Sequence, residues 1–196
     1  MPRRRYIFDP PDRFVAGTIG EPGDRTFFLQ AREGARVVSV ALEKVQVAVL
    51  AERLGALLDE LDLRGIAPET DATDSTIAAF EPPEAPSDNG GLDEPLNEAF
   101  RAGSLTLGWD GGAERVLVEA RAQDADGEAI DPEEDDEDDD EGPDLLRVRM
   151  TAAAARSFVA RATQVVAAGR PPCPLCGAPL DPQGHICPRR NGHFVN

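Results

Sequence analysis

An internal repeat constrains the fold of this 196-residue chain more than any other feature of its sequence. Three sequence blocks recur later in the chain, in the same order. The paired blocks are FVAGTIGEPGDRTFFLQA (14–31) with FRAGSLTLGWDGGAERVLVE (100–119), FFLQARE (27–33) with VLVEARA (116–122), and VSVALEKVQVAVLAERLGALL (38–58) with LRVRMTAAAARSFVARATQVV (146–166). Because self-similarity of this kind reports repeated structural units, we predict that the fold is a duplicated unit.

The paired blocks align individual residues. The first pair aligns Phe14, Ala16, Gly17 and Thr18 with Phe100, Ala102, Gly103 and Ser104. The third pair aligns Leu50, Arg53 and Leu57 with Phe158, Arg161 and Val165.

Each unit is predicted to contain three strands followed by a helix. The third strand alternates apolar with polar residues, as a half-buried strand does. The apolar residues of these strands are Val38, Val40 and Leu42, then Leu146, Val148 and Met150. Helical spacing follows in Val47, Leu50, Leu54, Leu57, Leu58 and Leu61, and in Ala155, Phe158, Ala162, Val165 and Val166. Thr151 is the predicted N-cap of the second helix. These patterns predict an α+β fold with a two-layer body.

Composition divides the chain into four segments. We predict a first β-β-β-α unit over 1–62 and a second over 97–169. Residues 63–96 are rich in Pro, Asp, Glu, Ser and Gly, and are predicted to be a disordered linker. Residues 124–144 contain 14 acidic residues and no basic one, and are predicted to be a disordered insertion in the second unit. The last segment, 170–196, is treated separately because all the cysteines lie in it.

The net charge of −17 makes some partners improbable. Binding to nucleic acid depends on Lys and Arg side chains that neutralise phosphates, so an acidic chain with few basic clusters is a poor candidate. No run of about 18 apolar residues exists, which predicts that the chain does not enter a membrane. An odd number of cysteines, two of them in C-x-x-C, favours a reduced cytoplasmic protein over a secreted one.

The C-terminal segment carries a predicted metal site. All three cysteines and both histidines of the chain fall within CPLCGAPLDPQGHICPRRNGH (173–193). Cys173 and Cys176 form a knuckle of the kind found in zinc ribbons, and Cys187 is the third predicted ligand. His185 is preferred as the fourth ligand because H-x-C places two ligands on one face of a strand. His193 remains the alternative. A four-ligand shell leaves no position for water, so we predict structural Zn²⁺ in a zinc-ribbon-like module.

No catalytic constellation is recognisable in the body. Walker, G-x-S-x-G, H-E-x-x-H and G-x-G-x-x-G motifs are absent, and no histidine or cysteine precedes residue 173. Arg53, Arg161 and Lys44 are weak candidates for contacts with an anion in a cleft between the two units. We therefore expect no catalytic residues.

The residues quoted above resemble a known family. PDRFVAGTIGEPGDRTFFLQA, VSVALEKVQVAVLAERLGALL and GRPPCPLCGAPLDPQGHICPRRNGH together resemble an uncharacterised actinobacterial family of repeat proteins, the domain of unknown function 3090. The resemblance extends over nearly all of the chain outside the linker and the acidic insertion. The cysteine cluster of that family matches Cys173, Cys176, His185 and Cys187. The resemblance implies no activity, because the family has none assigned.

Three functions follow from these features. The first is a non-enzymatic adaptor that binds a protein partner and carries a structural zinc tail. The second is an enzyme or enzyme subunit that binds a small anionic or phosphorylated metabolite between the units. The third is a nucleic-acid-binding regulator of the zinc-ribbon kind. We prefer the adaptor, because the sequence offers a metal site with a closed shell and no catalytic set.

Overall fold

The computed structural model describes the chain except at residues 1–2, 22, 67–87, 89, 125, 130–141, 170–172, 177–186, 188 and 190–196. Its secondary structure consists of seven strands and two helices. These are β1 (Arg5–Phe8), β2 (Arg13–Ile19), β3 (Thr26–Glu33), β4 (Arg36–Leu42), α1 (Lys44–Leu63), β5 (Glu98–Asp110), β6 (Arg115–Ala122), β7 (Leu145–Met150) and α2 (Ala152–Ala167). The mixed α+β class is therefore confirmed.

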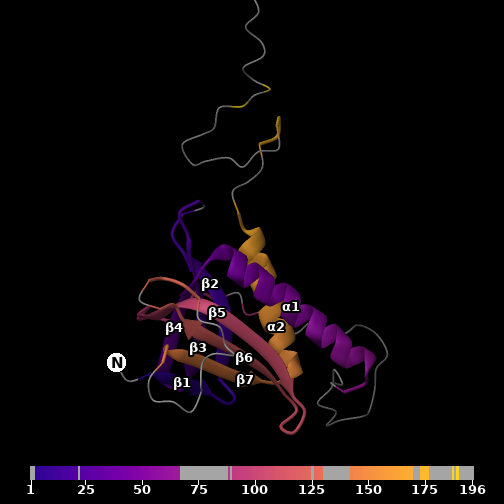
Figure 1. The fold of residues 1–196 in the computed structure, drawn as a ribbon. Helices are drawn as coiled ribbons and strands as arrows, with labels where there is room; N and C mark the ends of the chain where they lie inside the picture. Colours follow the sequence, from indigo (N-terminus) through magenta and orange to yellow (C-terminus); the bar gives the residue numbers. More distant parts are fainter. Residues whose placement is uncertain are drawn as a thin grey trace, which may run out of the picture.

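All seven strands form one sheet, in the order β1-β7-β6-β5-β4-β3-β2 (Figure 1). Neighbours within each β-β-β set are antiparallel, whereas β4 pairs with β5 and β1 with β7 in parallel. The strand-strand-strand-helix order occurs twice, first from β2 to α1 and then from β5 to α2. A common origin of the two units stays a prediction.

The sheet is strongly curled. Its two terminal strands, β1 and β2, are joined by only the four residues from Asp9 to Asp12. Arg36 on β4 reaches back to β1, where its Nη1 donates to the carbonyl of Ile7 at 3.0 Å and its guanidinium carbon lies 4.5 Å from the centroid of the Phe8 ring. Because a short connection cannot span an open seven-stranded sheet, the two ends of the sheet must approach each other.

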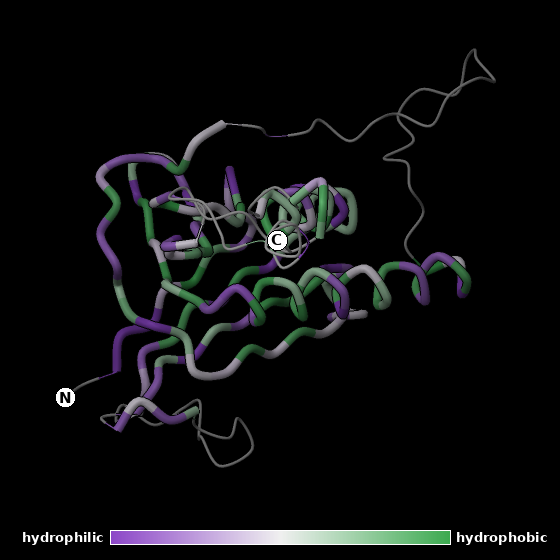
Figure 2. The backbone as a smooth tube through the Cα atoms, turned by 90° about the horizontal axis from the view of Figure 1, so that it is seen from above, coloured by the Kyte–Doolittle hydropathy of each residue, from purple (hydrophilic) through white to green (hydrophobic). Residues whose placement is uncertain are grey.

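Both helices pack on one face of the sheet and against each other, and this layer holds the core (Figure 1). The alternating apolar residues of β4 and β7 are all buried in that core, as predicted. Figure 2 shows hydrophobic and hydrophilic residues alternating along α1. Thr151 caps α2 as predicted, since its hydroxyl accepts from the Ala154 amide at 3.2 Å. The ring of Phe14 on β2 stacks on the ring of Phe158 on α2, with the centroids 4.8 Å apart.

The strand pairings align the first strands of the two units differently from the sequence match. Ile19 pairs with Thr26 at the end of the first hairpin, and Asp110 pairs with Arg115 at the end of the second. Counting back from these ends, Ala16 corresponds to Leu107 rather than to Ala102. The match between Phe14–Thr18 and Phe100–Ser104 is therefore not an equivalence of position, because β5 is the longer strand and contains a bulge.

The predicted linker ends earlier than expected. Residues 67–87 and 89 lie outside the described residues, but 88 and 90–93 contact the sheet and α2. Leu92 covers Gly17 so closely that a Cβ atom on that glycine would lie 2.5 Å from Leu92 Cδ2. Most of the predicted acidic insertion also lies outside the described residues. Asp144 at its end is held by Arg4, whose Nε donates to the carboxylate at 2.8 Å.

Candidate functional site

Three cysteine side chains converge after α2. The ligand atoms of Cys173, Cys176 and Cys187 all lie within 4.8 Å of one another, and Cys173 and Cys187 are buried. The sulfurs of Cys173 and Cys187 are 4.0 Å apart and all three thiols are free, so no disulfide links them. Cys173 and Cys187 thus lie close together although they are 14 positions apart in the sequence.

Backbone amides favour the thiolate form of Cys173. The amides of Cys176 and Leu175 donate to its sulfur and hold the pKa of the Cys173 thiol below its ordinary value, and the N–S distance for Leu175 is 3.4 Å. Burial opposes this shift. Thiolates, not thiols, bind metal ions, so the knuckle prepares Cys173 for ligation.

The cluster fits a tetrahedral metal ion. Sulfurs bound to one zinc ion lie about 3.8 Å apart, because each Zn–S bond is about 2.3 Å long. The observed separation of 4.0 Å between Cys173 and Cys187 is close to that value. Three cysteines could therefore hold a metal ion here. The predicted fourth ligand, His185 or His193, lies outside the described residues.

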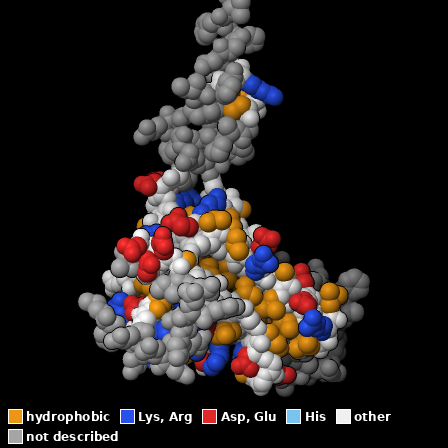
Figure 3. Space-filling model, viewed as in Figure 1, with side chains coloured by type: hydrophobic (Ala, Val, Ile, Leu, Met, Phe, Trp, Pro, Cys, Tyr) orange, Lys and Arg blue, Asp and Glu red, His pale blue; other side chains and the backbone are white. Residues whose placement is uncertain are grey.

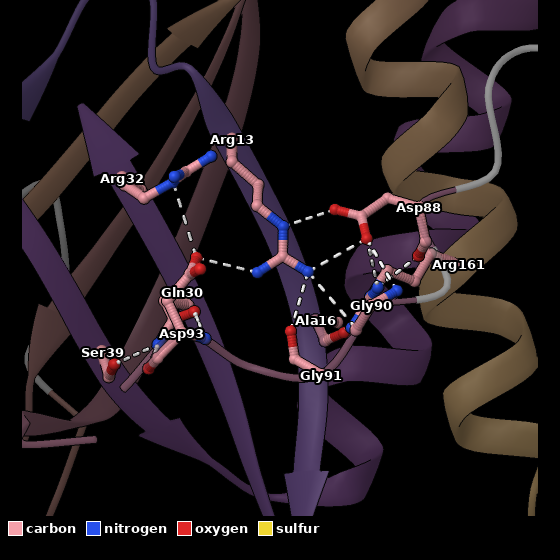
Figure 4. Close-up of polar contacts among 10 residues, drawn as sticks. All are labelled: Arg13, Ala16, Gln30, Arg32, Ser39, Asp88, Gly90, Gly91, Asp93 and Arg161. Atoms are coloured by element: carbon pink, nitrogen blue, oxygen red, sulfur yellow. Dashed lines mark hydrogen bonds and ion pairs between the residues drawn. The ribbon is translucent and has the colours of Figure 1, made fainter. Parts of the chain in front are cut away.

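Arg161 forms a second polar centre, at the edge of the sheet (Figure 4). It projects from α2 to the terminal strand β2, where its Nε donates to the carbonyl of Ala16 at 2.7 Å. Its Nη2 donates to the carbonyl of Gly90 at 2.7 Å, and its Nη1 contacts both the carbonyl and the carboxylate of Asp88. Arg161 therefore bonds to the edge of β2 that no described strand pairs with. It also bonds to Asp88 and Gly90, near the end of the predicted linker.

Arg13 completes this centre from the strand side. Its Nε donates to Asp88, its Nη2 to Asp88 Oδ1 at 3.0 Å, and its Nη1 to Asp93 at 2.8 Å. Hydrogen bonding from Arg13 lowers the pKa of Asp88 to about 2, against the opposing effect of burial. Burial is also the main reason that the pKa of Arg161 lies below its ordinary value. Arg32 Nε also lies 3.6 Å from Asp93 Oδ2, so three arginines share the two carboxylates.

The buried side-chain amide of Gln30 on β3 holds the backbone at Asp93. Gln30 donates from Nε2 to Ser39 Oγ and to the Asp93 carbonyl, each at 3.0 Å, and accepts from the Asp93 amide at 2.7 Å. Buried polar groups that are hydrogen-bonded in this way specify one position for a segment. Residues 88 and 90–93 are thus fixed across the first strands of the sheet.

The sheet face opposite the helices carries a third polar centre, which the sequence did not predict. Glu119 is buried on β6 and forms ion pairs with Arg121, at 3.2 Å, and with Arg147 on β7. Arg121 Nη1 also lies 3.3 Å from Thr106 Oγ1 on β5. In the sequence, these charged residues simply alternate with the apolar residues of the strands. Strands with one face in solvent show the same pattern, so it does not reveal a buried ion-pair centre.

The three predicted anion contacts do not share one cavity lining. Arg53 lines a groove between α1 and β5, with Val45, Gln46, Val49, Leu50, Gly103, Leu105 and Leu107. Arg161 is engaged with Asp88 and backbone carbonyls, and Lys44 is exposed at the start of α1. Among the described residues Arg53 has no hydrogen-bond or ion-pair partner.

A family model described as "Protein of unknown function (DUF3090)" matches residues 6–187. The chain belongs to this family. No curated protein and no solved structure matches it.

The DUF3090 match reaches from β1 to Cys187. Apart from Arg5 at the start of β1, it therefore includes every helix and strand of the described residues, together with the three clustered cysteines. In the part of the chain that the structure describes, no helix combines the length and the apolar content needed to cross a membrane.

Proposed function

We propose that this DUF3090 protein is a non-enzymatic cytoplasmic adaptor, which binds a partner protein and whose C-terminal segment is folded by a structural zinc ion. The observation that carries the proposal is the cluster of Cys173, Cys176 and Cys187 within 4.8 Å. The polar centres of the body support it, because Arg13, Arg161 and Glu119 are engaged in contacts within the chain rather than directed toward a substrate.

Zinc is the metal that this donor set suits best. Soft thiolate ligands select zinc, copper(I) or iron–sulfur clusters, and a C-x-x-C knuckle with one further cysteine and a histidine is a common structural zinc set. His185 is the preferred fourth ligand and His193 the alternative. Bound zinc would cross-link the two halves of the segment into a zinc-ribbon-like module. A segment of this length cannot form a hydrophobic core, so the metal would supply most of its folding energy.

The alternative of an anionic metabolite between the two units has less support. A cleft of about 560 Å³ is lined by residues of α1 and α2, the packed helices of the two units. Its lining contains the carboxylates of Glu52 and Asp59 and no Lys or Arg. Because carboxylates repel an anion, this cleft does not favour a phosphorylated ligand. Binding of nucleic acid is disfavoured by the net charge of −17.

Affinity capture tests the adaptor function. The zinc-loaded full chain would be compared with a chain ending at Arg170 and with Cys173→Ser/Cys176→Ser, each used to capture proteins for quantitative mass spectrometry. We expect one protein to be recovered in stoichiometric amount with the full chain. Its loss with both altered chains would place the contact on the zinc module, and its retention would place the contact on the body.

The adaptor function fails if no form of the chain recovers a stoichiometric partner. A panel of phosphorylated metabolites in a thermal-shift assay is the complementary measurement. A metabolite that raises the melting temperature of the full chain would support the enzyme or enzyme-subunit alternative instead, since a ligand that binds only the native state stabilises it.

A further inference from the structure

The groove between α1 and β5 combines an open strand edge with an apolar wall. The groove holds about 290 Å³. β4 pairs with β5 only as far as Arg101, so among the described residues no strand pairs with that side of residues 102–110. Gln46 on α1 caps the start of this edge, donating from Nε2 to the carbonyls of Ala102 and Gly103 at 3.2 Å each. Beyond that point no described strand occupies this side of β5, and an unpaired strand edge presents the N–H and C=O groups of alternate residues.

The apolar side chains that line this groove are unusually exposed to solvent. Val45 and Val49 on α1 are 65% and 47% exposed, and Leu105 and Leu107 on β5 are only partly buried. Figure 3 shows hydrophobic side chains gathered on this face, along α1 and beside β5. Contiguous apolar surface of this kind marks sites of protein contact, and an open edge is a template for an added strand.

The same molecule shows what fills the corresponding place in the first unit. There α2 lies beside the edge of β2, and Arg161 bonds to the Ala16 carbonyl and to the extended segment that contains Asp88 and Gly90. The helices begin at corresponding positions, directly after β4 and β7, so Arg53 on α1 corresponds to Arg161 on α2. Leu107, which corresponds to Ala16, lines the groove with Arg53. The arginine of the first site binds an aspartate and backbone carbonyls, whereas Arg53 has no described partner.

We infer that the groove between α1 and β5 binds an extended peptide of a partner protein as an added strand, with a carboxylate of that peptide bound to Arg53. The inference rests on the proposed adaptor function and names its contact surface. Main-chain hydrogen bonds to residues 102–110 supply affinity. Side chains at alternate positions of the peptide enter the groove against Val45, Val49 and Leu105, which selects aliphatic residues. Arg53 fixes the register, because a charged pair at one position discriminates between shifted alignments.

The peptide must therefore carry aliphatic residues at every second position and one acidic residue. Phage display of random peptides on the zinc-loaded full chain tests this directly. We expect enrichment of that pattern on the wild-type chain and loss of about tenfold or more in affinity with Arg53→Glu, since a carboxylate would then face a carboxylate. Arg64→Glu is the matched control, because Arg64 follows α1 outside the groove and pairs with Glu60. It is expected to retain binding.

Backbone pairing has its own test in the enriched peptide. Methylating the nitrogens at alternate residues removes the donors that face β5, and we expect binding to be lost for one set of positions and kept for the other. Loss for neither set overturns strand addition. Three results would overturn the peptide site. These are no enrichment of any peptide, the same enrichment on Arg53→Glu as on the wild type, and dimerisation of the chain through this groove. If a captured partner is unaffected by Arg53→Glu, the groove is wrong while the adaptor function stands; if no partner is captured at all, the adaptor function itself is wrong.

Discussion

Arg161 is the residue on which the edge of the sheet most depends. Its guanidinium bonds to Ala16 on β2 and to Asp88 and Gly90 of the segment that follows the linker. Replacing it with alanine leaves the buried carbonyl of Ala16 without this donor, whereas the Asp88 carboxylate keeps its hydrogen bonds from Arg13. We expect Arg161→Ala to lower the free energy of unfolding by about 2–4 kcal/mol, measured by urea denaturation.

Arg53 provides the control for this prediction, because it occupies the corresponding helix position and is exposed. Arg53→Ala is expected to change the free energy of unfolding by less than about 0.5 kcal/mol. Arg161→Lys should recover only part of the loss, since an ammonium cannot reproduce the planar fork. Equal stability of Arg161→Ala and the wild type would show that the edge contact contributes nothing.

Asp88 makes the same site sensitive to acid. Its pKa is lowered in the folded protein from 3.8 to about 2, chiefly by hydrogen bonds from Arg13. A depressed folded-state pKa means that the carboxylate stabilises the fold above about pH 4, and that this stability is lost as the pH falls toward 2. Because the side chain is 36% exposed, we expect the contribution to be only about 1 kcal/mol.

Urea denaturation between pH 2 and pH 6 measures this contribution. Wild type should exceed Asp88→Asn in stability at pH 5, and the difference should close as the pH approaches 2. Asp59→Asn is a suitable control, because Asp59 is exposed on α1 and has no ion pair among the described residues. A difference that does not depend on pH would assign the effect of Asp88→Asn to packing instead of charge.

Sequence reasoning found some of these residues for reasons that differ from their structural roles. Arg53 and Arg161 align between the units, and the structure places both on corresponding helices. Nothing local in the sequence indicated that Arg161 bonds to Ala16, because that contact joins residues 145 positions apart and depends on which strand lies at the edge. The cysteine spacing, in contrast, is a local signal, and Cys173, Cys176 and Cys187 do converge.

At the scale of elements, residues 88 and 90–93 cover part of the first strands of the sheet. Their apolar contact is Leu92 on Gly17 of β2, and a Cβ atom on Gly17 would lie 2.5 Å from Leu92 Cδ2. We expect Gly17→Val to lower the free energy of unfolding by about 1–3 kcal/mol through overpacking. The double variant Gly17→Val/Leu92→Ala should lose less than the sum of the two single variants.

Gly108 on β5 is the matched control, because it is also a strand glycine and a Cβ atom there would meet nothing within 4 Å. Gly108→Val should be neutral or stabilising, since a β-branched residue favours a strand over glycine. Additive effects of Gly17→Val and Leu92→Ala in a double-mutant cycle would contradict the packing of the segment on β2.

The elements with regular periodicity were the predictable ones. Alternation identified the strands ending at Leu42 and Met150, helical spacing identified α1 and α2, and Thr151 gave the start of α2. The short strand β1 and the contacts of residues 88 and 90–93 were missed, because they have too few residues to show a period. The register of β5 was also misjudged, since a bulge and a longer hairpin shift it relative to the sequence match.

At the scale of the whole molecule, the helix of each unit lies beside a strand of the other. α2 packs on β2, and α1 forms the groove with β5. The sequence predicted two units and two layers but not this exchange, because strand order depends on contacts between residues far apart in the chain. The two units therefore share a single hydrophobic core. We expect the body to unfold as one cooperative transition.

Metal removal should leave that transition nearly unchanged. The core cluster extends to Ala162 and the last turns of α2 and contains none of the cysteines. We expect chelation, or the variant Cys173→Ser/Cys187→Ser, to expose the C-terminal segment to proteolysis while the melting temperature of the body, followed by circular dichroism, changes little. A large fall in melting temperature would show that the segment is part of the body.

The metal centre is the central claim of this account, and X-ray absorption at the zinc edge of untagged protein tests it most directly. We expect one zinc per chain, bound by three sulfurs and one nitrogen, with no exchangeable oxygen ligand. His185→Ala should replace the nitrogen ligand by an oxygen if His185 is the fourth ligand, and His193→Ala should do so if it is His193. Absence of bound zinc, or an exchangeable water on the wild-type metal, would contradict a structural centre; water on the metal would instead indicate a catalytic one.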